Sequence, residues 1–184
     1  MKISTVIIGI CLPFLGMAQK YYGITGGVIA GNVLISIDPK VSDINQPYNM
    51  KLGMTFGATL GGKLNNNIGI NTALKYQEFI SSNKQDEKLK RQYLSLSLSP
   101  EYYYYRDLSI VGGVSASRPL NDDFPGTTLL HPMGHLGLAV TTQYFRVEIL
   151  GIRSIGAFGY NQNSSHRTNY YHRACQLTFS YILQ

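Results

Sequence analysis

Apolar and polar residues alternate one by one along most of this chain, and this alternation constrains the fold more than any other feature. In residues 50–63, Met50 and Leu52 fall on one side of an extended backbone, whereas mostly glycine, threonine and lysine fall on the other. Successive side chains of a β-strand point to opposite faces, so a period of two predicts strands. No stretch shows sustained helical periodicity.

The same pattern recurs in eight segments, which predict eight strands. They cover residues 21–31, 50–63, 67–79, 94–101, 108–117, about 134–144, 145 onward and about 170–183. In the seventh segment Arg153 would fall on the apolar face, so we expect a bulge near Gly151 that swaps the faces.

The connections between these segments alternate in length. Short turns are expected at Asn65–Asn67, Arg106–Asp107 and Gln143–Phe145, and long polar loops at 32–49, 80–91, 118–133 and 161–169. Short turns join antiparallel neighbours. The chain is therefore expected to form an all-β, antiparallel up-and-down meander in one domain, with its long loops at one end.

The residues opposite the apolar ones indicate which face meets water. A soluble barrel needs long charged residues on its outer face, but here the polar face is mostly Gly, Ser, Thr, Ala and Asn. Small polar residues fit the inside of a narrow barrel. The sequence therefore predicts an eight-stranded antiparallel transmembrane β-barrel whose leucines, such as Leu96, face lipid. A soluble, lipocalin-like binding barrel with its apolar side inward is the alternative.

Aromatic residues collect at both ends of the meander, as expected of belts at the two membrane interfaces. The short-turn belt is expected to contain Tyr21, Tyr22, Tyr102, Tyr103, Tyr104, Tyr105, Tyr144, Phe179 and Tyr181. The long-loop belt is expected to contain Tyr76, Tyr93, Phe158, Tyr160, Tyr170 and Tyr171.

The first residues have the pattern of a secretory signal peptide. Lys2 precedes an apolar run from Val6 to Leu15, and small residues occupy the −3 and −1 positions of a cleavage site after Ala18. The run is shorter than the roughly 20 residues of a membrane-spanning helix, although an uncleaved anchor is the alternative. Residues 1–18 are thus expected to be the signal peptide and 19–184 the barrel domain. Loss of Lys2 lowers the net charge from +6 to +5.

Four stretches resemble the PorT-like outer-membrane β-barrel family, small OmpA/OmpX-like barrels of Gram-negative bacteria. They are MKLGMTFGATLGGKLNNNIGINTALKYQEF (50–79), YLSLSLSPEYYYYRDLSIVGGV (93–114), RVEILGIRSIGAFGYN (146–161) and CQLTFSYIL (175–183). The resemblance implies an antiparallel barrel in the outer membrane without catalytic residues. The chain departs from many such barrels by ending in Leu183–Gln184 in place of an aromatic residue.

Charged residues on the polar face are expected inside the barrel. They are Lys51, Lys63, Lys75, Arg91, Glu101, Arg146 and Glu148. Charges in a narrow lumen are costly unless they are paired or hydrated. We therefore expect Glu101 and Glu148 to pair with Lys63 and Arg146 and to plug the short-turn end, with a gated conduction path as the alternative.

The histidines and acids suggest no catalytic, cofactor or metal site. His131, His135, His166 and His172 are expected near the long-loop end, with Asp122 and Asp123. They lack a recognised ligand spacing for Zn or Cu, so exposed loop histidines are the favoured interpretation. A set of His135 with Glu148 or Ser115 is disfavoured, because Glu148 is expected at the opposite end.

These patterns together predict an integral outer-membrane protein with a structural or interaction role through extracellular long loops. Outer-membrane lipid is the expected partner, with lipopolysaccharide or a protein at the loops. A nucleic-acid partner is excluded by the export signal and by the lack of a Lys/Arg cluster. A narrow pore for small solutes and a lipid-modifying outer-membrane enzyme are the alternative functions.

Overall fold

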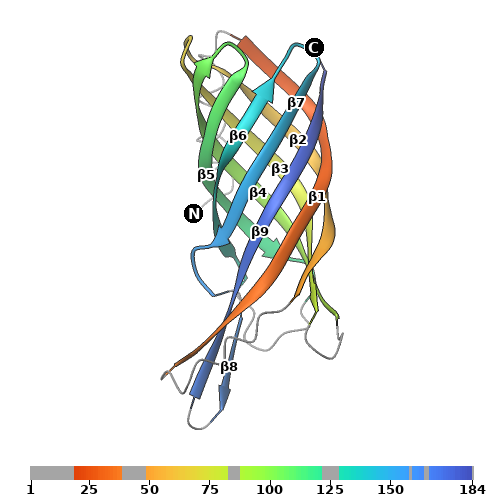
Figure 1. The fold of residues 1–184 in the computed structure, drawn as a ribbon, viewed down its shortest axis with the longest axis vertical. Coiled ribbons are helices and arrows are strands. Elements are labelled where there is room, and N and C mark those ends of the chain that lie inside the picture. The colour runs from red at the N-terminus through yellow and green to blue at the C-terminus, as the bar shows by residue number, and fades with distance from the viewer. Residues whose placement is uncertain are drawn as a thin grey trace, which may run out of the picture.

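The chain forms a closed, all-antiparallel β-barrel (Figure 1). The computed structural model describes residues 19–38, 49–82, 88–121, 129–157, 159–163 and 166–183. Its strands are β1 (Gln19–Asp38), β2 (Asn49–Lys63), β3 (Ile68–Ser82), β4 (Lys88–Tyr105), β5 (Leu108–Pro119), β6 (His131–Thr141), β7 (Phe145–Ser154), β8 (Gly159–Asn163) and β9 (His166–Leu183).

Eight of these strands close the ring and one lies outside it. The sheet order is β1-β2-β3-β4-β5-β6-β7-β9-β8, and β1 also pairs with β9. β8 forms a short hairpin with the start of β9, within the stretch expected to be a long loop, and extends beyond the barrel wall in Figure 1. The predicted up-and-down fold with eight barrel strands is confirmed. In the described residues no helix is long and apolar enough to cross a membrane.

The strands tilt strongly against the barrel axis. A path of directly paired residues around the ring runs through Tyr22, Leu60, Thr72, Leu98, Val114, Gly134, Arg153, Arg173 and Asn32. The path returns to β1 ten residues beyond its start (32 − 22 = 10). With eight strands this shear corresponds to a tilt of about 40° and to an interior just wide enough for side chains.

Apolar side chains cover the outside of the barrel, and polar side chains line much of its inside. In β4, Leu94, Leu96 and Leu98 are 42%, 39% and 41% exposed. Ser95, between the first two leucines, and Ser99, directly after Leu98, are buried in the lumen. A soluble barrel would have the reverse arrangement, so the lipocalin-like alternative does not describe this fold.

The seventh barrel strand differs from the sequence prediction. β7 pairs with β6 and β9 without a register shift, so there is no bulge at Gly151. Strict alternation therefore continues, and Arg153 lies exposed on the outer face, directly opposite Arg173 of β9. The expected bulge was wrong because Arg153 lies close to the long-loop rim, where a cation on the outer face is no longer in the apolar band.

Three tyrosines expected in the belts point inward. Tyr103 and Tyr93 are 2% and 1% exposed, and the Tyr21 hydroxyl accepts a hydrogen bond from the interior side chain of Asn71 at 2.7 Å. Their neighbours Tyr22, Tyr102 and Tyr104 are exposed instead. Adjacent residues of a strand cannot both face lipid, so only every second tyrosine joins a belt.

The remaining belt positions divide between the two ends. Tyr105, Tyr144, Phe179 and Tyr181 are exposed on the short-turn half. On the other half the Tyr76 ring stacks on Phe56 with 4.8 Å between centroids, and Tyr170 and Tyr171 are half-buried. Phe158 lies outside the described residues, as do the side chain of Tyr160 and the expected signal peptide, 1–18.

Candidate functional site

A buried arginine organises the short-turn half of the lumen. Arg146, the second residue of β7, points inward and its side chain is 0% exposed. Its Nη1 and Nη2 donate to Glu101 of β4 at 3.2 and 2.6 Å, in a two-pronged pair. Its Nε and Nη2 donate to one oxygen of Glu148 at 3.1 and 2.7 Å, and Nη1 also donates to Thr141. Two carboxylates thus surround one guanidinium.

A second cation balances this cluster. Lys75 of β3 lies with its Nζ 3.3 Å from Oε2 of Glu148, which also accepts from the Thr178 hydroxyl at 3.1 Å. The Tyr103 hydroxyl donates to Glu101 at 2.7 Å. Two cations and two carboxylates therefore meet in one hydrogen-bonded cluster with no net charge. Buried ion pairs are tolerated only with such complete pairing.

Lys75, rather than the expected Lys63, is the lysine that pairs with an acid of the ionic cluster. Lys63, expected to pair with the acids, donates to the backbone carbonyl of Arg106 at 2.7 Å and lies 4.3 Å from the centroid of the Tyr103 ring. It is the last residue of β2 and lies at the short-turn rim, half-buried. Lys75 lies deeper in the lumen and reaches Glu148 instead. Strand tilt sets these levels, because it displaces each strand along the axis relative to its neighbours.

The other two expected interior charges lie toward the long loops. Lys51 is exposed, at a place where β2 and β3 lose their regular register between Met50 and Thr55. Lys51 is therefore not enclosed within the lumen. Arg91 of β4 is 1% exposed, and its Nη1 donates to the backbone carbonyl of Asn121 at 3.1 Å.

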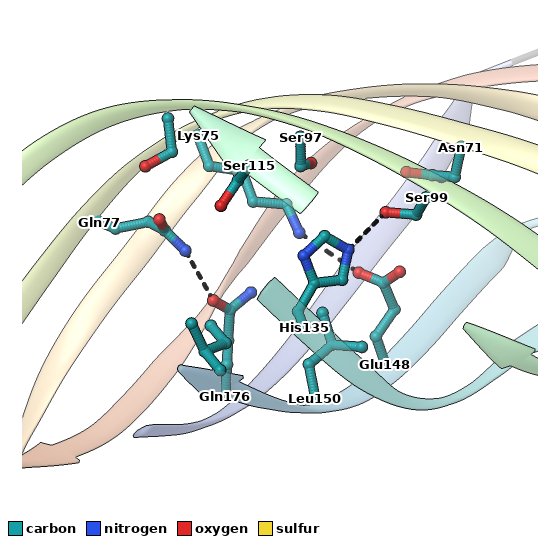
Figure 2. Close-up of a pocket in the computed structure, with 12 residues that line it drawn as sticks. Asn71, Lys75, Gln77, Ser97, Ser99, Ser115, His135, Glu148, Leu150 and Gln176 are labelled. Atoms are coloured by element: carbon teal, nitrogen blue, oxygen red, sulfur yellow. Dashed lines mark hydrogen bonds and ion pairs between the residues drawn. The ribbon is translucent and has the colours of Figure 1, made fainter. Parts of the chain in front are cut away.

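A small cavity lies next to the ionic cluster, near the middle of the barrel. Its volume of about 20 Å³ gives room for roughly one water molecule. Figure 2 shows Lys75 and Glu148 on one side of it and the Gln77–Gln176 hydrogen bond, 2.8 Å long, on another. His135 also points into this space and its Nε2 lies 2.8 Å from the Ser99 hydroxyl (Figure 2). No space for a larger molecule accompanies these groups.

Aromatic and imidazole rings fill the long-loop half of the lumen. Phe79 stacks on His172 with 4.6 Å between ring centroids and meets Tyr93 edge-on at 5.7 Å. The Tyr93 hydroxyl lies 2.8 Å from Nε2 of His172, and His131 Nε2 lies 2.9 Å from the Ser154 hydroxyl. All of these side chains except Ser154 are at most 3% exposed. They form a second plug, here called the aromatic plug.

Three of the four histidines are therefore interior residues rather than exposed loop residues. His131 and His172 belong to the aromatic plug, and His135 lines the central cavity. The side chain of His166 lies outside the described residues, as do Asp122 and Asp123. Among the side chains that are described, no three His, Cys, Asp or Glu residues are arranged to hold a metal ion. Strand alternation could have predicted their interior location, since His131, His135 and His172 all fall on inward positions.

His135, Ser115 and Glu148 are closer together than expected. All three line the same central cavity, so the expectation that Glu148 lies at the opposite end was wrong. β6 and β7 have only 11 and 10 residues, so a residue in the long-loop half of one strand and a residue in the short-turn half of the other are only a short distance apart along the barrel axis. The hydrogen-bond partners of Glu148 described above are Arg146, Lys75 and Thr178, whereas His135 bonds Ser99.

One acidic side chain on the outer wall was not anticipated. Glu78 of β3 has the outward parity of Leu74 and Tyr76 but is covered by its neighbours and is 5% exposed; its Oε2 lies 2.6 Å from Nζ of Lys90. The Tyr76 hydroxyl also donates to it at 3.3 Å. The alternation of β3 alone was sufficient to place Glu78 outside. These contacts neutralise the carboxylate where the apolar band ends.

Comparisons with known proteins find structural likeness without family identity. No family model matches the chain and no curated protein matches it. The crystal structure of Ail, the attachment invasion locus protein of Yersinia pestis, is similar at 13% identity, covering 90% of this chain and 99% of Ail with a TM-score of 0.47. The outer membrane protein AlkL, solved in DMPC bilayers, is similar at 11% identity, with 92% of each chain covered and a TM-score of 0.46.

A third similar structure is a larger protein. The deltaS2 mutant of the monoaromatic hydrocarbon channel TodX is similar at 14% identity, covering 82% of this chain and 38% of TodX, with a TM-score of 0.38. The PorT-like resemblance has no matching family model and stays a prediction.

Proposed function

We propose that this chain is an integral outer-membrane β-barrel that does not conduct solutes and acts through its long-loop end, in a structural or interaction role. The single observation that carries the proposal is the inside-out distribution of side chains. Leucines and tyrosines cover the outer wall, whereas a neutral ionic cluster is enclosed within it. Such a wall requires a nonaqueous environment, and a closed barrel leaves no unpaired strand edge within it.

Exposed cations lie near both ends of the barrel. Arg118, Arg153 and Arg173 are exposed on outward positions at the long-loop side of the apolar band. Cations at this depth can meet anionic headgroups at the membrane surface. Lys20 and Arg106 are exposed at the short-turn end as well, so the proposed placement of the long loops outside the cell rests on the export signal and the PorT-like resemblance of the sequence.

Two plugs favour a closed lumen over a pore. The ionic cluster crosses the lumen in the short-turn half, behind a hollow of about 460 Å³ at the short-turn rim, and the aromatic plug fills the long-loop half. The cavity between them has room for about one water molecule. The narrow-pore alternative requires both plugs to move. Planar-bilayer recordings test this point, and discrete conductance steps from the purified protein would contradict a closed barrel.

We also propose that the barrel is not an enzyme. The Ser99–His135 pair faces a cavity too small for a substrate, and the nearby carboxylate of Glu148 is held by Arg146 and Lys75. A general base must reach the reacting group, which this enclosure prevents. The lipid-modifying alternative predicts loss of a lipid product in a Ser99→Ala variant, and such a loss would overturn this proposal.

The membrane location is tested by placing a charge on each face of β4. Leu96→Arg puts a cation on the outer wall near mid-depth and should destabilise the barrel in liposomes by roughly 2–4 kcal/mol. Urea unfolding in liposomes, read by the shift in gel mobility between unboiled and boiled protein, measures the change. Leu96→Ser is the uncharged control. A fully tolerated Leu96→Arg would contradict a lipid-facing wall.

A further inference from the structure

A shallow groove lies on the outer wall across β6, β7 and β9. These strands lie side by side on the near face in Figure 1. The groove has a volume of about 470 Å³, and its lining is mainly apolar. Leu136 and Gly151 line the part toward the short turns, Gly134 and Arg153 lie one step nearer the long loops, and Ile155 and Arg173 also line the groove.

The glycines that make this groove are not required by the packing of the barrel. A Cβ on Gly134 would meet no atom closer than Cγ1 of Ile155 at 3.8 Å, and one on Gly151 none closer than the Leu136 carbonyl at 3.6 Å. By contrast, a Cβ on the inward Gly137 would lie 1.9 Å from a backbone oxygen of β7. Side chains would fit at both outward positions, so their absence leaves an open hollow in the lipid-facing surface.

Two arginines lie side by side in the part of the groove nearer the long loops. Arg153 of β7 and Arg173 of β9 are directly paired across the two strands, and both are exposed. Like charges directly opposite one another are destabilising. Among the described side chains, no carboxylate lies within ion-pair distance of either guanidinium. An anion between them would relieve the repulsion and accept hydrogen bonds from both.

The vertical order of these features defines the ligand. Arg153 is directly paired with Gly134, and Gly151 with Leu136 one step deeper, where the wall continues with Ile149 and Leu177. The arginines therefore lie one step nearer the long loops than Gly151 and Leu136, and from these two residues an apolar wall continues toward the membrane centre. A ligand that fits is anionic at its long-loop end and hydrocarbon toward the membrane centre, which is the layout of a membrane lipid with a phosphate headgroup.

We propose that this groove binds the lipid A part of lipopolysaccharide, with one phosphate between Arg153 and Arg173 and one acyl chain over Gly134 and Gly151. The choice of lipid A rests on the proposed function, because long loops outside the cell put this edge in the outer leaflet. Planar guanidinium groups bind phosphate in two-pronged fashion, which suits a fixed phosphate on a rigid sugar.

The test is a titration of the full barrel in detergent with lipid A, with phosphatidylglycerol and with inorganic phosphate, followed by native mass spectrometry. Wild-type protein should retain lipid A in preference to the other two. The double variant Arg153→Gln/Arg173→Gln should bind lipid A roughly tenfold or more weakly, because two charged hydrogen-bond donors are lost. Gly151→Leu should weaken lipid A by filling the hollow while leaving both arginines in place.

Matched variants keep the test specific. Arg118→Gln removes an exposed outward arginine of β5 that does not line the groove, and Gly26→Leu adds a side chain at a distant outward glycine, where a Cβ meets nothing closer than 3.9 Å. Both should bind lipid A like wild type. Unchanged binding by the double arginine variant, or an equal loss in Arg118→Gln, would overturn the site.

Two further outcomes separate this inference from the proposed function. Equal retention of phosphatidylglycerol, or full competition by inorganic phosphate, would overturn the assignment to lipid A while the membrane barrel stands. Each variant is also scored for heat-dependent gel mobility in liposomes. If wild-type protein shows no folded, heat-sensitive band in any bilayer, the membrane location fails, and lipid A retention cannot rescue it.

Discussion

The two halves of the barrel interior are filled by different chemistry. In the short-turn half, Arg146, Lys75 and two glutamates neutralise one another through directional bonds. In the long-loop half, Phe79 and Tyr93 pack against two histidines with few charges nearby. A charged cluster fails when one partner is removed, whereas a packed cluster fails by the volume that is lost. Interior position alone therefore does not set the cost of a substitution.

The largest effect is expected from removing the central cation. Arg146→Met leaves Glu101 and Glu148 facing one another without their shared partner, and should destabilise the barrel by about 3–5 kcal/mol. Urea unfolding in liposomes measures this change. Arg153→Met, which removes an exposed outward arginine of the same strand, is the control and should have a much smaller effect.

A second-site change sharpens this result. Arg146→Met/Glu101→Gln removes one of the stranded charges, so it should recover part of the lost stability. Strictly additive losses in the double variant would show that the cluster does not act through charge balance, and the contrast between the two halves would then disappear.

The aromatic plug should respond to lost volume. Phe79→Ala leaves a cavity between His172 and Tyr93 and should cost about 3 kcal/mol, as for other buried phenylalanines. Phe56→Ala removes an exposed ring of the outer wall, where lipid can fill the gap, and should cost less. The same unfolding assay compares the two variants. Equal costs would mean that the long-loop half is not a packed core.

A single hydroxyl tests the polar part of the aromatic plug. Tyr93→Phe removes the 2.8 Å contact with His172 but keeps the ring, and should cost about 1 kcal/mol. Tyr102→Phe alters an exposed belt tyrosine and serves as the comparison. A cost above that of Phe79→Ala would reverse the ranking and assign the plug to hydrogen bonding rather than packing.

The smallest effect is expected at the short-turn rim. Lys63→Met removes the bond to the Arg106 carbonyl and the contact with the Tyr103 ring, at a partly solvated position. We expect a loss below about 1 kcal/mol in the same assay. A loss as large as that of Arg146→Met would place Lys63 within the ionic cluster after all.

Alternation made most of the fold predictable from sequence, because one parity rule fixes the face of every residue in a regular strand. The same rule, applied strictly, would have placed Tyr21, Tyr93 and Tyr103 inside and Glu78 outside. Grouping tyrosines by their distance from the turns overlooked that parity. The run from Tyr102 to Tyr105 most clearly needed it, since Tyr102 and Tyr104 are exposed and Tyr103 between them is buried. Tyr105 is also exposed, because it ends β4 where the register with β5 shifts.

The depth of a residue along the barrel axis was less predictable from sequence than the face of the sheet on which it lies. The shear of ten residues shifts levels around the ring, so the sequence distance from a turn does not give a common height. Lys63 and Lys75 were confused for this reason, and Glu148 and His135 were separated. The packed cluster in the long-loop half was not predicted, because Phe79, His131 and His172 have no charge pattern that marks them as neighbours.

The ladder that closes the ring has a kinetic consequence. β1 and β9 are paired over seventeen residues, from Tyr22–Leu183 to Asp38–Arg167, whereas β7 shares only nine pairs with each of its neighbours, β6 and β9. This pairing joins the first and last strands of the barrel domain, so its formation has the greatest entropic cost. We therefore expect it to form last during folding. Once formed, it is also the longest ladder of paired residues between two strands of the ring. Opening should therefore start along β7, whose ladders are the shortest in the ring, and the β1–β9 pairing should separate last.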